Sequence, residues 1–246
     1  MRLLRTTQAV QQACQSAATT VRSAPAPVFT LAPRWHTRAL VLLILAVAVT
    51  GSLLGPQARP APTSRLAELY LPLLVVNLSL AFYVSRFGLG RSLFGDLFSS
   101  RASTLSDALI NAAWAAGLVG SVLCSEKLLE VLVGLPDSAA AHALTAQSQL
   151  ERACWLGVAA CVGFSEELVY RGYLQRQLAA LTGNLGLAIA LQAALFGIAH
   201  AEQGQWAVAR FGFYGLLFGG VAARRQTILP GVLAHVTLDI SAGLGG

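Results

Sequence analysis

Long apolar stretches alternate with short polar ones along most of the chain. Most of them approach the roughly 17–25 residues that a membrane-spanning helix needs, and the Gly and Pro residues between them mark turns. A chain inside lipid must satisfy its own backbone hydrogen bonds, so the stretches are expected to be helices. The pattern predicts an all-α, polytopic bundle of about seven spanning helices. The apolar segments are 39–54, 69–85, 106–124, 150–170, 185–201, 206–223 and 227–244.

Composition supports an integral membrane protein. Only 11% of the 246 residues are charged and 55% are hydrophobic, whereas soluble domains carry about 25% charged residues. The net charge of +6 comes from arginines scattered over loop positions. We therefore expect membrane lipids as surroundings and no nucleic-acid partner.

Three regions are expected along the chain. Residues 1–38 contain arginines but no acidic residue, which predicts a basic, disordered arm. A transit peptide, which is also rich in Arg and Ser and poor in acids, is the alternative. Residues 39–104 would hold the N-terminal transmembrane helices, and residues 105–246 would form a C-terminal domain that carries the chemistry.

The arginines also predict the orientation, because inner loops of membrane proteins carry more Lys and Arg than outer loops. With the arm inside, five of the 17 Lys and Arg residues lie in the arm and seven more in later inner segments. An N-in, C-out topology follows, in a bacterial inner membrane or, as the alternative, a plastid membrane. Trp35, Trp155 and Trp206 lie near the ends of spans, where we expect interfacial anchors.

Ionisable side chains inside the spans are concentrated in the C-terminal half. Such residues are costly in a bilayer, they usually mark function, and they need partners. The fourth, fifth and seventh spans carry them: Glu166, Glu167, Arg171, His200, His235 and Asp239.

Their spacing predicts which of them share a face. Glu167 and Arg171 are four positions apart, which is the geometry of an intrahelical ion pair. Glu166 then points about 100° away from Glu167 on a helix of 3.6 residues per turn. His235 and Asp239 are also four positions apart and should face one cavity.

Depth in the membrane can be compared by counting from the turns. Glu166 and His200 lie 17 residues on either side of Gly183, so at about 1.5 Å per residue they reach similar depth. His235 lies only ten residues after Arg225. His235 therefore matches the depth of Glu166 and His200 less well, unless the fourth or fifth span extends beyond the inner membrane surface.

Carboxylates beside two histidines suit hydrolysis. A carboxylate serves as general base, and histidines serve as hydrogen-bond donors or metal ligands. Two histidines and an acidic residue would equally supply three ligands to a zinc ion with one position open.

Three short motifs occur in order, at helix positions that fit this chemistry. They are EELVYRGYL from Glu166, FGIAH ending at His200, and HVTLD from His235 to Asp239. They resemble the EExxxR, FxxxH and HxxxN or HxxxD motifs of the CPBP family of intramembrane metalloproteases, which includes CAAX proteases and bacteriocin-processing proteins. The resemblance covers roughly residues 105–244.

The resemblance implies an intramembrane endopeptidase in residues 105–246 that acts on a membrane-associated peptide or protein. Glu166 would activate water with help from His200, and His235 with Asp239 would stabilise the oxyanion or bind metal. Zinc dependence and a metal-free glutamate mechanism both stay open, and an Asp at position 239, where many relatives have Asn, leaves its role open.

Other polar and aromatic residues are expected to have structural roles only. Glu167 and Arg171 would be a structural ion pair that holds the motif helix. Tyr170 and Phe196 are expected to pack, and Glu202 to lie in a solvated outer turn.

Two further function classes stay open: a non-catalytic immunity or scaffold protein that keeps the family bundle, and a transporter. The transporter is disfavoured because neither an inverted repeat nor a pair of broken helices occurs. The motifs do not identify the substrate or say whether it is prenylated.

Overall fold

The structure is a computed structural model that describes residues 31–53, 64–89, 104–134 and 144–245. Helices dominate this part of the chain, and it contains no strand, which confirms the predicted all-α class. Most of the predicted arm and several loops that carry the orientation argument lie outside the described residues.

The helices follow the predicted segments closely. A π-helical turn, η2 (Leu66–Tyr70), precedes α3 and another, η3 (Val84–Leu89), follows it; η4 (Leu168–Leu174) joins α7 to α8. The remaining elements are α2 (Arg34–Leu53), α3 (Leu71–Tyr83), α5 (Leu105–Val133), α7 (Gln149–Glu167), α8 (Gln175–Thr182), α9 (Leu185–Ala199), η5 (Ala201–Gln203), α10 (Gln205–Arg225) and α11 (Leu229–Leu244).

Five helical stretches among the described residues are long and apolar enough to cross a membrane. They are Arg34–Leu53, Leu66–Gly88, Leu105–Leu132, Gln149–Thr182 and Gln205–Arg225. Helices α9 and α11 are apolar but only 15 and 16 residues long. The seven predicted segments are therefore all helical, and two of them are short for a full span.

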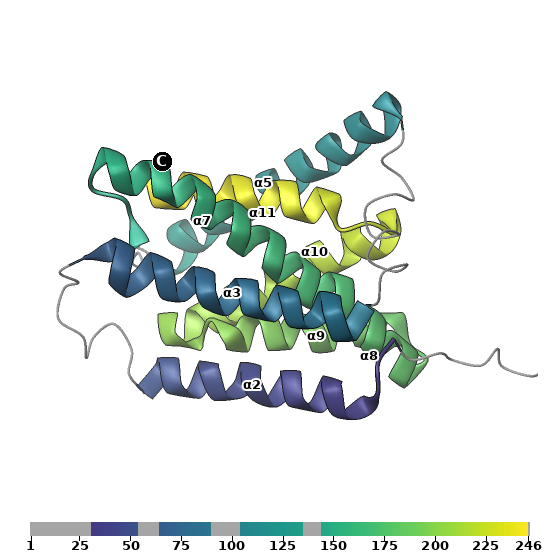
Figure 1. Ribbon diagram of the computed structural model, residues 1–246. Coiled ribbons are helices and arrows are strands. Elements are labelled where there is room, and N and C mark those ends of the chain that lie inside the picture. The colour runs from purple at the N-terminus through teal and green to yellow at the C-terminus, as the bar shows by residue number, and fades with distance from the viewer. Residues whose placement is uncertain (1–30, 54–63, 90–103, 135–143, 246) are drawn as a thin grey trace, which may run out of the picture.

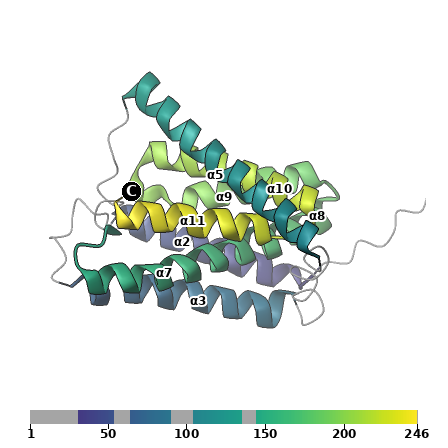
Figure 2. The ribbon, with the colours of Figure 1, turned by 90° about the horizontal axis from the view of Figure 1, so that it is seen from above.

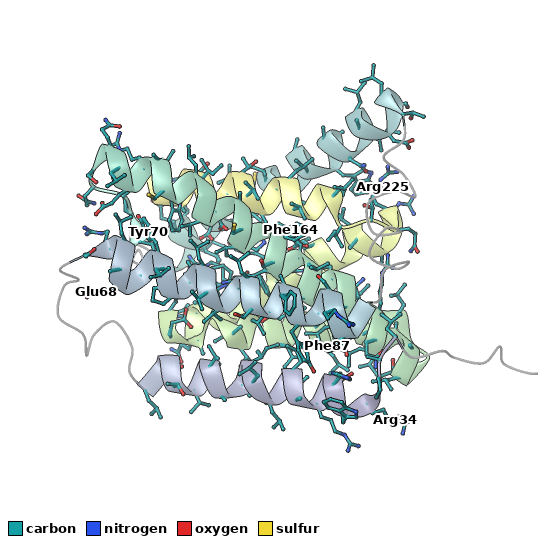
Figure 3. The ribbon with its side chains drawn as sticks, in the orientation of Figure 1. Arg34, Glu68, Tyr70, Phe87, Phe164 and Arg225 are labelled. Atoms are coloured by element: carbon teal, nitrogen blue, oxygen red, sulfur yellow. The ribbon has the colours of Figure 1, made fainter. Side chains whose placement is uncertain are left out.

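Most helices run side by side, and α5 crosses α10 and α11 obliquely (Figures 1 and 2). Arg34, Phe87 and Arg225 lie toward one end of the bundle and Glu68 toward the other (Figure 3). Phe164, two residues before the first motif, lies between these ends. Basic helix ends thus share one side of the molecule, and the N-in, C-out orientation stays a prediction.

Small residues set the tight contact between α9 and α10. A Cβ added to Gly197 would lie 2.3 Å from the carbonyl oxygen of Val208, and one added to Gly215 would lie 2.7 Å from Cα of Ala193. Close approach of this kind is how membrane helices gain packing energy. It holds the end of α9, and with it His200, against α10.

The fourth span is longer than the others. Helices α7, η4 and α8 form one continuous stretch of 34 residues, Gln149–Thr182, about 50 Å at 1.5 Å per residue. It ends where predicted, at Gly183 in the left-handed conformation, and Asn184 caps α9 through Leu187. His235 nevertheless reaches the depth of the first motif, since it lies 3.2 Å from Glu167 and 3.6 Å from Glu166.

The start of the described chain is tied to α8 through Gln177, which is fully buried. Its Oε1 accepts from the backbone N–H of Leu31 (2.7 Å) and Ala32 (3.3 Å). Its Nε2 donates to the carbonyl of Ala32 (2.7 Å) and to Thr37 Oγ1 (3.1 Å). Helix α2 begins at Arg34, inside the range predicted as an arm, and it is clamped to the motif helix.

Replacing Gln177 by alanine is expected to lower the free energy of unfolding by about 1–3 kcal/mol, because four polar atoms lose a hydrogen bond and three of these bonds are buried. Thermal unfolding in detergent checks this. Gln205→Ala is the control, because Gln205 is exposed at the start of α10. Equal melting temperatures for the Gln177 variant and the wild type would show that the clamp does not contribute to stability.

Candidate active site

A cavity of about 880 Å³ lies between α2, α3, α7, α9 and α11. Glu166, His200, His235 and Asp239 all line it, so the structure brings the four predicted residues to one space. Much of the remaining wall is apolar and comes from α2 and α3, with residues such as Leu40, Ile44, Val47, Leu73 and Val76. The four polar side chains therefore lie on one wall of a cavity that is otherwise largely apolar.

His235 is the centre of the polar cluster. Its Nδ1 lies 3.2 Å from Glu167 Oε1, and since a carboxylate only accepts, Nδ1 carries the hydrogen. Its Nε2 lies 3.6 Å from Glu166 Oε2 and 3.8 Å from Asp239 Oδ2. Three carboxylates from two helices thus surround one imidazole.

Glu167 and Arg171 form the predicted ion pair. Arg171 Nη1 donates to Glu167 Oε1 at 2.8 Å, and neither side chain is exposed. The guanidinium also lies over the Phe196 ring, 4.4 Å from its centroid, and 5.3 Å from that of Phe218. The same Glu167 oxygen holds His235, so the pair orients the ring as well as the helix, a contact that the spacing did not predict.

Glu166 points into the cavity rather than toward the ion pair. Its side chain is 17% exposed, and its Oε2 has no hydrogen-bond partner among the described residues. The 3.6 Å separation from His235 Nε2 is too long for a hydrogen bond. Oε2 is buried beside His235, and the side chain as a whole keeps its exposed part on the cavity.

His200 is held by two aromatic residues. Its Nδ1 lies 2.8 Å from the carbonyl oxygen of Phe196, so Nδ1 carries the hydrogen and Nε2 is the unprotonated nitrogen of the neutral ring. Phe211 of α10 stacks on the ring at 3.9 Å between centroids and 15° between planes. Phe196 packs edge-on against both His200 and His235.

Asp239 is anchored through its backbone. Trp155 Nε1 donates to the Asp239 carbonyl at 2.8 Å. Trp155 is buried against Tyr70, 5.2 Å between ring centroids, so the prediction that it is an interfacial anchor is wrong. Burial follows from its position on the face of α7 that packs on α11. Trp35 and Trp206 are exposed, as the prediction for them requires.

Some residues of the site, on α10 and η5, were not predicted from the sequence. Phe211 belongs to none of the motifs, and only the fold brings it against His200. Glu202 and Gln203 are half-buried and line the cavity, because η5 packs on α2. A Cβ added to Gly51 of α2 would lie 3.3 Å from Glu202 Cβ.

Gly231, in the first turn of α11, makes room for the ion pair. A Cβ at this position would lie 2.5 Å from Glu167 Oε2. Gly231→Ala is therefore expected to displace Glu167 and to lower the free energy of unfolding by about 1–3 kcal/mol. Thermal unfolding measures this against Gly220→Ala, whose added methyl group would meet no atom within 4 Å. A Gly231 variant that is as stable as the Gly220 variant would contradict the tight fit.

The fit of a metal ion can be tested on these side chains. Among the described residues, no group of three or more His, Cys, Asp and Glu side chains has an arrangement that could hold one. The three residues that the resemblance implies as zinc ligands, His200, His235 and Asp239, share the cavity without forming such a group.

Comparison with known families agrees with the motifs. Residues 148–241, which run from the cap of α7 almost to the end of α11, match the model of the family described as type II CAAX prenyl endopeptidase Rce1-like. This segment, less than half of the chain, is similar to that family. The Rce1-like segment, residues 148–241, contains all six predicted site residues and Phe211.

The Rce1-like segment is shorter than the predicted C-terminal domain. It begins at α7, so α5 lies outside it, and the boundary at residue 105 stays a prediction. No curated protein and no solved structure matches the chain. The match of this segment to an endopeptidase family supports the predicted intramembrane endopeptidase at the level of the family, and the apolar helices make the chain an integral, multi-pass membrane protein.

Proposed function

We propose that the protein hydrolyses a peptide bond of a membrane-associated peptide or protein, with Glu166 as the general base. One observation carries the proposal: Glu166, His200, His235 and Asp239 line a single, largely apolar cavity in a segment that matches an endopeptidase family. An extended peptide enters such a cavity with its side chains against apolar walls and its scissile carbonyl beside the polar cluster.

The first step is attack by water. A water molecule held by Glu166 and by the unprotonated Nε2 of His200 gives one proton to Glu166 while its oxygen bonds to the carbonyl carbon. The carbonyl electron pair moves to the oxygen, forming a tetrahedral intermediate. When the carbon–nitrogen bond breaks, Glu166 returns the proton to the leaving amine, and the new carboxylic acid gives its remaining proton to solvent, which leaves a carboxylate and an amine.

The second part of the proposal concerns the oxyanion. With both ring nitrogens protonated, His235 donates from Nε2 to the negatively charged oxygen, Glu167 holds the ring at Nδ1, and the Asp239 carboxylate lies beside Nε2. Glu167 is itself fixed by Arg171 at 2.8 Å. Preorganised donors of this kind contribute because they need no reorganisation during the reaction.

A zinc ion bound by His200, His235 and Asp239 is the competing version of the mechanism, and it would act as a Lewis acid on the carbonyl or the water. A chelator separates the two versions. Hydrolysis by the proposed mechanism is expected to keep its rate after dialysis against EDTA. A loss of more than about 100-fold that zinc restores would favour the metal.

The function itself is tested with purified protein in lipid vesicles and a library of membrane peptides, analysed by mass spectrometry. An endopeptidase produces paired fragments from internal bonds, and prenylated and unprenylated peptides in the library report the substrate class. A folded wild type that cleaves no peptide, prenylated or not, would favour the non-catalytic scaffold.

A further inference from the structure

Phe211 of α10 belongs to none of the three motifs, yet its ring covers one face of the His200 imidazole. The two rings are nearly parallel, with 15° between their planes and 3.9 Å between their centroids. Phe196 also contacts the imidazole, but at 64° between the ring planes. The His200 ring therefore packs on two aromatic side chains, and of the two Phe211 is the one that lies parallel to it.

The stack fixes a motion of the His200 ring that its hydrogen bond leaves open. The bond from Nδ1 to the Phe196 carbonyl, 2.8 Å long, holds one atom of the ring. A ring joined to the chain at Cγ and held at Nδ1 can still tilt about the line between these atoms, because the χ2 torsion of histidine has broad minima. A flat side chain against the face of the ring prevents this tilt. The hydrogen bond and the stack together set the direction of the unprotonated Nε2.

Two neighbours of Phe211 on α10 are fixed by one carboxylate of α5. Arg210 Nη1 donates to Glu126 Oε2 at 3.0 Å, and the Tyr214 hydroxyl donates to Glu126 Oε1. The Arg210 guanidinium carbon lies 5.3 Å from the centroid of the Phe211 ring, and the centroid of the Tyr214 ring lies 5.7 Å from it. We call Glu126, Arg210 and Tyr214 the α5 clasp. It fixes two side chains that pack on the Phe211 ring.

The α5 clasp places two ionisable side chains in helices that are long and apolar enough to cross a membrane. Glu126 is 38% and Arg210 22% exposed. Such residues are costly in a bilayer and usually mark function, but these two do not line the candidate active site. Their connection to the chemistry is through Phe211, which follows Arg210 in the chain and does line that cavity.

We propose that Phe211 is a positioning residue for His200 and that the α5 clasp holds Phe211 in place. The inference rests on the proposed function, in which Nε2 of His200 holds the attacking water. A displacement of about 1 Å at the reacting atoms can lower the rate about 100-fold. The direction of Nε2 therefore matters more than the presence of an apolar side chain beside the ring. Helix α5 thereby supports the hydrolysis from outside the Rce1-like segment.

Hydrolysis by substituted proteins tests the role of the Phe211 ring. Phe211→Leu keeps an apolar side chain but removes the stack, whereas Phe211→Tyr keeps the stack. Phe213→Leu is the matched control, because Phe213 is an exposed residue of the same helix. Thermal unfolding verifies that each variant is folded.

We expect Phe211→Leu to lower kcat about tenfold and to change KM less than about twofold. Phe211→Tyr should lower kcat less than about threefold, and Phe213→Leu should keep the wild-type kcat. A folded Phe211→Leu variant with the wild-type kcat, or with a raised KM alone, would overturn the proposal. So would a Phe211→Tyr variant that is as slow as Phe211→Leu.

The α5 clasp is tested with Glu126→Gln, which removes the charge that Arg210 pairs with. We expect this variant to lower kcat about threefold, the effect of a partly exposed ion pair. Glu130→Gln makes the same chemical change one turn further along α5 on an exposed side chain, and it should leave kcat unchanged. Equal kcat values for the two variants would overturn the role of α5.

Nitrogen-15 NMR of the histidine side chains tests the positioning without a peptide. The chain has four histidines, and the His200 signals are those lost in His200→Gln. The wild type should show a protonated Nδ1 and an unprotonated Nε2, whose chemical shifts lie far apart. In Phe211→Leu the two shifts should move toward each other, because the freed ring exchanges between tautomers, and Phe211→Tyr should restore them.

The NMR result separates this inference from the proposed function. Unchanged His200 shifts in Phe211→Leu would overturn the positioning role of Phe211, whatever the rate of hydrolysis. A set of proteins that shows the expected shifts, while the wild type cleaves no peptide, would refute the proposed hydrolysis alone.

Discussion

Glu166→Gln is expected to lower kcat/KM for peptide hydrolysis by about 100- to 10,000-fold, the usual contribution of a general base. The amide keeps the shape of the carboxylate but cannot accept a proton from water. Glu166 makes no hydrogen bond that the substitution would break among the described residues, since its Oε2 has no partner there. Initial rates on one cleaved peptide, measured in the same vesicles, check the loss.

The control for this variant is Glu130→Gln, which makes the same chemical change on an exposed side chain of α5. It should hydrolyse the peptide at the wild-type rate. Both variants should unfold at the wild-type temperature. A Glu166 variant that keeps more than a tenth of the wild-type kcat/KM would remove Glu166 from the role of base.

Arg171→Met is expected to lower the free energy of unfolding by about 3–5 kcal/mol, because it leaves the buried Glu167 carboxylate without its counterion. Both side chains of this pair have no exposed surface. Thermal unfolding in detergent reports the change. The double variant Glu167→Gln with Arg171→Met removes both charges and should regain part of the loss.

An exposed ion pair provides the comparison. Lys127 and Glu130 lie 2.9 Å apart with side chains 70% and 62% exposed. Lys127→Met should change the free energy of unfolding by less than about 1 kcal/mol, as is typical of surface pairs. Equal effects of Lys127→Met and Arg171→Met would contradict the structural role of the buried pair.

The sequence predicted local features well because they depend on residues close together in the chain. The pair of Glu167 and Arg171 follows from a spacing of four on a helix, and the turn at Gly183 follows from its residue types. The π-helical turn η4, which contains Arg171, did not disturb that pairing. Spans were located from hydropathy alone, although two proved short for a membrane.

Contacts between distant segments were not predictable in this way. Glu167 and His235 are 68 positions apart, and their contact depends on how α11 docks on α7. The stacking of Phe211 on His200 depends on glycines that let α10 approach α9. The clamp of Gln177 on Leu31 and Ala32 crosses most of the chain, and no local pattern signals it.

Peptide hydrolysis is tested most directly with wild-type protein in vesicles. The protein is incubated with one membrane peptide in water enriched in oxygen-18. Mass spectrometry then follows the peptide. The proposed mechanism predicts two fragments whose combined mass is that of the peptide plus one water, with a heavy oxygen in the new carboxylate. Recovery of only the intact peptide, from folded protein that binds it, would contradict hydrolysis by this site.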